Sequence, residues 1–202
     1  MRKKLFREKP VKNYLQDKIN HLKNSIGNLS LQSVNNRQFI DLEKNFLVDF
    51  PVIDTSKLKV TLNLEDPYGR IYNENLNAEY GRPDVFAIAT CEIPFTGDAE
   101  IFDLFPQLYT SRDYLAEVSL NTIKFKVNSG YVRKDLPDEK KEFVRKCIIE
   151  VVQYIEDNLK NLKVPIQNYN DSLSGRIDEF IETKRMAADR GKKINDDLNP
   201  FI

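Results

Sequence analysis

The chain has 202 residues, of which 41% are hydrophobic and 31% are charged, and its formal net charge is zero. This composition supports a real hydrophobic core and excludes global disorder. No apolar run approaches the roughly 18 to 20 residues of a membrane span, and polar residues interrupt the basic N-terminus where a signal sequence would be apolar. We therefore predict a cytoplasmic protein without membrane contact, and Met1 favours a whole small gene product or an N-terminal fragment.

Charge is unevenly distributed along the chain. Residues 1–37 have nine Lys or Arg against two Asp or Glu, whereas residues 38–121 have six against fifteen. In one interpretation, which we favour, the basic arm approaches the acidic body and the charges partly compensate. We expect residues 1–12 to be mobile and to tune association electrostatically. In the other, cations of the arm contact nucleic acid or an acidic partner. The cations in question are Lys3, Lys4, Arg7 and Lys9.

Helical periodicity dominates the first fifty residues. Apolar residues recur every three or four positions from Val11 to Ile26, which predicts an amphipathic helix with Gly27-Asn28 as its C-terminal stop. Residues 28–37 are polar and are predicted to be a linker. A second short helix is predicted from Phe39 to Phe50, where Pro51 ends it.

Strand periodicity follows. Apolar residues alternate with polar ones from Leu58 to Glu65, which predicts a half-exposed strand. Val85 to Ile93 is apolar on both faces and is predicted to be a central strand covered on each side. Tyr114–Leu120 and Thr122–Val127 are predicted to form an antiparallel pair. In its second strand Ile123, Phe125 and Val127 face inward, and Lys124 and Lys126 face outward.

The pattern after Pro137 is helical almost to the C-terminus. Apolar stripes run from Val144 to Leu162 and from Ile166 to Ile181, on either side of Pro165. A continuous helix to residue 190 would be about 75 Å long, more than one small domain covers. We therefore expect either two helices packed antiparallel or one long helix that self-associates as in a coiled coil. Either way the stripes would contact an effector or a second copy, through residues that include Leu159 and Tyr169.

These patterns predict an α+β fold with a small, mostly antiparallel sheet, an N-terminal helix and a long C-terminal helical pair. Residues 1–37 would form the basic arm and helix, and residues 38–136 the sheet unit. Residues 137–202 would form a helical hairpin or a long kinked helix, packed as one domain with the sheet.

The sequence assembles no recognisable catalytic centre. Cys91, Cys147 and His21 lie far apart in the sequence and cannot form a zinc site of the usual kind, and we expect buried, reduced thiols. Asp84 and Glu92 resemble the opening of a metal-dependent PD-(D/E)xK nuclease. That chemistry needs a lysine two positions after the glutamate, where Pro94 stands instead. We predict no catalytic residue, metal or cofactor, and keep a divergent nuclease as an alternative.

A polar loop from Asp66 to Arg82 combines tyrosines with arginines. These residue types are enriched in recognition surfaces, and loops carry function more often than scaffolds do. The loop is therefore a candidate partner-binding surface. Its predicted contact residues are Tyr68, Arg70, Tyr72 and Arg82.

Several short runs resemble a module of bacterial antiphage defence proteins. They are Glu92-Ile93-Pro94-Phe95-Thr96-Gly97-Asp98, Glu100-Ile101-Phe102, Ala116-Glu117-Val118, Tyr169-Asn170-Asp171-Ser172-Leu173, Lys184-Arg185 and Leu198-Asn199-Pro200. In that family an α+β unit with a long helical part accompanies a restriction-endonuclease-like or TIR effector domain. The resemblance covers roughly residues 40–200 and implies a non-catalytic sensor, adaptor or regulatory subunit that acts on an effector protein. A nucleic-acid-binding subunit is a further alternative.

Overall fold

The computed structural model describes residues 3–35, 40–65, 86–106 and 113–199. They divide into two compact units, each built from segments far apart in the sequence. The first unit contains residues 1–9 and 50–161, and the second contains residues 10–49 and 162–202. Each unit therefore combines parts of more than one of the predicted ranges 1–37, 38–136 and 137–202. The mixed α+β class with a long C-terminal helix is confirmed.

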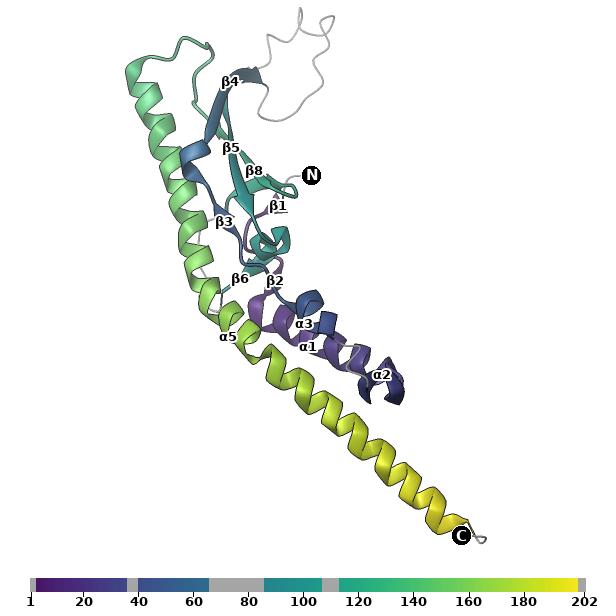
Figure 1. The fold of residues 1–202 in the computed structure, drawn as a ribbon. Coiled ribbons are helices and arrows are strands. Elements are labelled where there is room, and N and C mark those ends of the chain that lie inside the picture. Colours follow the sequence, from purple (N-terminus) through teal and green to yellow (C-terminus); the bar gives the residue numbers. More distant parts are fainter. Residues whose placement is uncertain (1–2, 36–39, 66–85, 107–112, 200–202) are drawn as a thin grey trace, which may run out of the picture. The chain divides into compact units, whose positions relative to one another are not determined.

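The first unit is built on an antiparallel sheet (Figure 1). Its order is β1 (Lys3–Lys4), β7 (Leu115–Val118), β8 (Thr122–Asn128), β5 (Phe86–Thr96) and β3 (Val52–Ile53), and β4 (Lys59–Glu65) also pairs with β5. The described part of this unit also contains two short 3₁₀ helices, η1 (Thr55–Lys57) and η2 (Ala99–Asp103), and the short strand β6 (Leu104–Phe105). The strand β2 (Lys9–Pro10) lies where the two units meet in the sequence.

Three predictions about the sheet are confirmed. β5 is its central strand, hydrogen-bonded to β8 on one side and to β3 and β4 on the other. β7 and β8 form the predicted antiparallel pair, in which Ile123, Phe125 and Val127 are buried. β4 has no fully buried residue, as expected of a half-exposed strand.

One face of this sheet packs on the long helix α5 (Asp138–Leu198). In the first unit, the helix buries a stripe that begins with Val144, Ile148, Val151 and Ile155. Phe125 of β8 and Val151 line a common cavity, so this stripe faces the side of the sheet that carries the buried residues of β8. The opposite face carries the lysines of β8 and the charged residues of β4.

The C-terminal region is a single helix of 61 residues, so of the two predicted arrangements the structure has the one long helix and not the antiparallel pair. Pro165 lies inside α5, where it was expected to start a new helix or kink a long one. Proline lacks an N–H group, so the carbonyl of Asn161 loses its usual helical partner four residues on. The helix continues because its apolar residues are buried on both sides of Pro165, in the first unit before it and in the second unit after it. In the second unit the buried residues of α5 are Leu162, the last of the first stripe, and then Ile166, Tyr169, Leu173, Ile177 and Ile181.

In the described part of the second unit, three shorter helices pack on residues 162–185 of α5. These are α1 (Val11–Asn28), α2 (Leu31–Asn35) and α3 (Ile40–Phe46), so the predicted N-terminal helix is confirmed and the predicted linker contains a short helix. Gly27 lies inside α1, which ends one residue later. At this helix end the Lys184 ammonium donates to the carbonyl oxygens of Ile26 and Gly27, and the Ile26 carbonyl also accepts from Leu29 N–H at 3.2 Å.

A polar clamp joins α5 to the chain that follows α3. The Asn170 side chain accepts from Val48 N–H at 3.0 Å and donates to Val48 O at 2.9 Å. The neighbouring residue on α5, Tyr169, donates its hydroxyl hydrogen to Phe46 O at 3.0 Å. These bonds satisfy backbone groups beyond the helix end, where no helical partner exists.

Candidate functional site

The N-terminal segment, residues 3–8, is part of the folded sheet and not the mobile arm that its charge suggested. β1 pairs with β7, and Leu5 N–H donates to Tyr114 O at 3.0 Å. Phe6 N–H donates to Phe102 O at 2.7 Å. The side chains of Leu5 and Phe6 are 0% and 1% exposed. A segment with two fully buried apolar side chains is part of the core. The charged side chains of this segment therefore start from a fixed backbone.

Phe6 anchors the segment in a cluster of aromatic rings. Its ring centroid lies 5.9 Å from that of Phe102 and 5.9 Å from that of Tyr154. Phe95 and Tyr114 extend the cluster at either end, each with a ring 4.8 Å from its neighbour. Phe6 has φ 56°, a left-handed conformation that costs a bulky residue about 1–2 kcal/mol. Burial of the ring offsets this strain.

The basic side chains of the segment pair with acidic groups of the same unit. Lys3 forms an ion pair with Asp103. Lys4 Nζ and Arg7 Nε lie 2.7 Å from the two carboxylate oxygens of Asp113. The hydrogen bond from Lys4, with the charge of Arg7, holds the pKa of Asp113 below its usual value. The interpretation in which the basic arm meets the acidic body therefore describes this segment. Lys9, in β2, is half-buried.

Because these cations already face carboxylates, we expect weak, salt-sensitive binding of the full chain to mixed DNA and RNA. Binding should fall steeply between low and physiological salt, since phosphate contacts release counterions. Truncation of the arm would remove Leu5 and Phe6 from the core, so Lys4→Gln is the cleaner variant and Lys12→Gln its exposed control. Submicromolar binding at physiological salt that Lys4→Gln abolishes would contradict this expectation.

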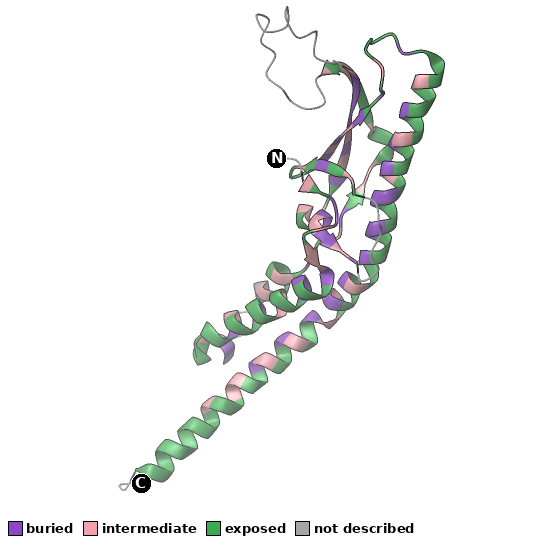
Figure 2. Ribbon diagram, turned by 180° about the vertical axis from the view of Figure 1, so that it is seen from behind, coloured by how far each residue is buried: buried purple, intermediate pink, exposed green. Residues whose placement is uncertain are grey.

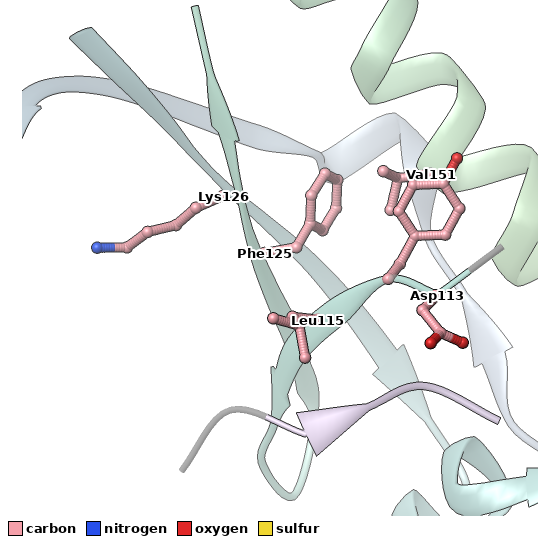
Figure 3. A pocket seen from close by; sticks show the side chains of 6 residues that line it. Asp113, Leu115, Phe125, Lys126 and Val151 are labelled. Carbon is pink, nitrogen blue, oxygen red and sulfur yellow. The ribbon is translucent and has the colours of Figure 1, made fainter. Parts of the chain in front are cut away.

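A small open cavity lies between the β7–β8 hairpin and α5. Its volume is about 220 Å³. Figure 3 shows the side chains of Phe125 from β8 and Val151 from α5 close to one another, while Lys126 points away from them. Lys126 instead pairs with Glu65 of β4. Asp113 also lines the cavity, but its carboxylate already pairs with Lys4 and Arg7. The cavity therefore has an apolar wall and no unpaired charge from Asp113.

The loop residues Tyr68, Arg70, Tyr72 and Arg82 lie outside the described part of the chain, and so does Asp84 of the nuclease alternative. Glu92, its second carboxylate, lies on the polar face of the sheet. The hydrogen bond from Lys124, at 2.7 Å, lowers the pKa of Glu92. Among the described residues, no group of three His, Cys, Asp or Glu side chains could hold a metal ion.

Leu159 and Tyr169, the predicted partner contacts on the C-terminal helix, are buried within their own units. They are 6% and 5% exposed. Both are therefore packing residues of this chain. Tyr169 is held in place by its burial and by the hydrogen bond from its hydroxyl group to Phe46 O. A charged substitution at either would disturb the fold whether or not a partner binds. Partner contact has to be tested at exposed positions of α5.

The two cysteines are free thiols in different surroundings. Cys91 is fully buried in β5, and burial raises its pKa from 9.0 to about 12. Both thiols were expected to be buried, but Cys147 on α5 is only half-buried. Its partial burial and the negative charge of Glu150 raise the pKa of the Cys147 thiol. A raised pKa keeps a thiol protonated and unreactive at neutral pH.

Sequence reasoning missed a row of charges that crosses the polar face of the sheet. Lys59, Glu92, Lys124 and Glu117 lie side by side on β4, β5, β8 and β7. Their signs alternate, so each neighbouring pair is attractive. Strand periodicity indicates which residues face outward but not which of them become neighbours, because register is set by pairing across the sheet.

Sequence reasoning also missed how far α5 extends beyond the last of its residues that packs against the rest of the described chain. Its last buried residue is Ile181, and residues 191–199 are all exposed (Figure 2). Three large apolar side chains are among the exposed residues of this end: Met186, Ile194 and Leu198, at 51%, 57% and 76%. We call residues 186–199 the uncovered end of α5.

No protein-family model matches this sequence, and neither a curated protein nor a solved structure matches it. The resemblance to the antiphage defence module therefore stays a prediction. Within the described residues, none of the helices has the length and apolar character needed to cross a bilayer.

Proposed function

We propose that this chain is a non-catalytic adaptor or regulatory subunit that acts by contact with another protein through the uncovered end of α5. The observation that supports this proposal is the exposure of a helical segment with large apolar side chains, well beyond the last residue that the chain itself buries. In this role the two folded units hold the helix, and its end presents the contact surface.

The physical chemistry of helices supports this assignment. An isolated helix shorter than about 12–15 residues is marginal in water, because most helical stability comes from packing of an apolar face. Ala187, Gly191, Ile194 and Leu198 recur at spacings of four, three and four, which is one face of a helix. A partner that covers this face would bury Ile194 and Leu198 and stabilise the end of the helix.

The charge pattern of the uncovered end favours a protein partner. Cations at Arg190, Lys192 and Lys193 are followed by anions at Asp196 and Asp197, so the end has both signs. A surface for nucleic acid would be positive throughout. On the resemblance described above, we propose that the partner is the effector of a bacterial antiphage defence system, with this chain as its sensor or adaptor.

Co-purification with the products of neighbouring genes tests this proposal. The tagged full chain is compared with the double variant Ile194→Lys and Leu198→Lys, in which lysines also suit the negative end of the helix dipole. We expect at least a tenfold loss of capture, because two apolar contacts are replaced by charges that must stay solvated. Circular dichroism and the melting temperature of each variant confirm that the fold is kept.

Asp189→Lys is the matched control, because it introduces the same side chain on the opposite face of the helix and should leave capture unchanged. The proposal fails if no neighbouring gene product is captured. It also fails if capture survives the double variant unchanged.

A further inference from the structure

β4 is an edge strand in the described part of the chain. It pairs with β5 along its whole length, from Lys59 opposite Glu92 to Glu65 opposite Phe86, and with no other described strand. Val60 and Leu64 are 50% and 44% exposed, although both lie on the face of the sheet that packs on α5. An edge with exposed apolar side chains is a template for another strand.

The backbone direction of β5 fixes which groups of β4 are free. Ser129 N–H donates to Ala87 O at 3.1 Å, and Phe95 N–H donates to Asn121 O at 2.9 Å. Odd-numbered residues of β5 therefore direct their backbone groups toward β8. Since backbone groups alternate along a strand, even-numbered residues of β5 direct theirs toward β4.

The same alternation then applies to β4 itself. Thr61 lies opposite Thr90 and Lys59 lies opposite Glu92, so the odd-numbered residues of β4 bond to β5. The even-numbered residues direct their N–H and C=O groups to the open edge. This outward row consists of Val60, Leu62 and Leu64.

We propose that β4 pairs antiparallel with β4 of a second copy of this chain, around a two-fold axis at Leu62. In this register Leu62 meets its own counterpart, and Val60 meets the second copy's Leu64. All three outward residues then take part in hydrogen-bonded pairs, so the open edges of both copies are satisfied together. Contact of one patch with itself is the isologous arrangement that closes a dimer.

The side chains of β4 are complementary to themselves in this register. On the polar face, Lys59 lies opposite the second copy's Glu65, and the reverse pair forms on the other side of the axis. Glu65 already pairs with Lys126, so the second lysine would join an existing ion pair. On the other face the exposed apolar side chains of Val60 and Leu64 meet across the axis. A register shifted by two residues loses both charge pairs and leaves outward groups unpaired.

This inference goes beyond the proposed function, because it uses the first unit and leaves the uncovered end of α5 free. One pair of seven-residue strands buries less area than a standard protein interface. The expected result is therefore a weak dimer whose population rises with protein concentration, measured by sedimentation equilibrium on the full chain.

Charge reversal with mixing tests the register. Lys59→Glu and Glu65→Lys each place like charges opposite one another twice per dimer, so each should weaken its own homodimer roughly tenfold or more at low salt. An equimolar mixture of the two variants restores both attractive pairs and should dimerise as well as the wild type. A purely structural defect in either variant would not be repaired by mixing.

Backbone blocking tests the hydrogen bonds. Val60→Pro removes an outward N–H group while the bonds to β5 remain, because proline is tolerated on the open side of an edge strand. It should abolish the dimer, whereas Thr61→Ser, on the polar face, should not.

A wild-type chain that is monomeric at every concentration reached would overturn the inference. So would a dimer that neither charge variant weakens, or a mixture that is not restored. A dimer lost with Ile194→Lys and Leu198→Lys but kept with Val60→Pro would also overturn it, while leaving an assembly role for α5. Loss of partner capture with an intact β4 dimer bears on the proposed function alone.

Discussion

Phe6→Ala is expected to lower the free energy of unfolding of the full chain by about 3–5 kcal/mol, as removal of a buried aromatic ring does in other cores. The ring is 1% exposed and contacts Phe102 and Tyr154. Alanine keeps a Cβ atom at φ 56°, so the strain of the left-handed backbone is not relieved. Urea unfolding followed by tyrosine fluorescence measures the change.

The matched control for this prediction is Leu120→Ala, because Leu120 is 91% exposed in the turn before β8. Its effect should lie within about 0.5 kcal/mol of zero. An effect of Phe6→Ala as small as that of the control would mean that residues 3–8 do not belong to the core, and the mobile-arm interpretation would return.

Alkaline pH is expected to destabilise the chain through Cys91. Burial raises the pKa of this thiol in the folded state to about 12, while the unfolded thiol ionises near its ordinary value of 9.0. Between these values the unfolded state has released a proton that the folded state retains. Stability therefore falls as pH rises, by about 1.4 kcal/mol per pH unit in this window, and the contribution of the thiol is fully present below pH 9.

Cys91→Ala separates this effect from the titration of lysines and tyrosines. The variant is less stable at neutral pH because it leaves a small cavity, but its stability should fall less steeply from pH 9 to 12 than that of the wild type. Cys147→Ala is the control, since that thiol is only half-buried. Equal slopes for wild type and Cys91→Ala would show that the thiol ionises in the folded chain without cost.

Local periodicity was sufficient for most elements. The 3.6-residue pattern of Val11 to Ile26 and the alternation of Ile123, Phe125 and Val127 both appear in the structure as predicted. These patterns report which face of an element is apolar, and that property is encoded in neighbouring residues. The unbroken helix through Pro165 was harder to predict, because proline disfavours helix locally and only packing on both sides of it overrides that preference.

The role of the N-terminal segment could not be predicted from local patterns. The six cations of residues 1–12 indicated a solvated arm, and Leu5 and Phe6 alone were too few to show periodicity. The partners come from η2 and from the two residues before β7: the Phe102 and Tyr114 carbonyl groups, and the carboxylate of Asp113. Each lies about a hundred positions away in the sequence, where no local pattern connects them.

The amino-acid sequence by itself determined the α+β class, the central position of β5 and the apolar faces of α1 and α5, because each depends on residues within one element. Tertiary structure alone decided which elements became neighbours. It placed Lys59, Glu92, Lys124 and Glu117 side by side, and it left the outer edge of β4 without a partner among the described strands. It also made Ile181 the last buried residue of α5. Register, edges and cover arise from contacts between segments distant in the sequence, and the surfaces proposed here for protein partners depend on those contacts.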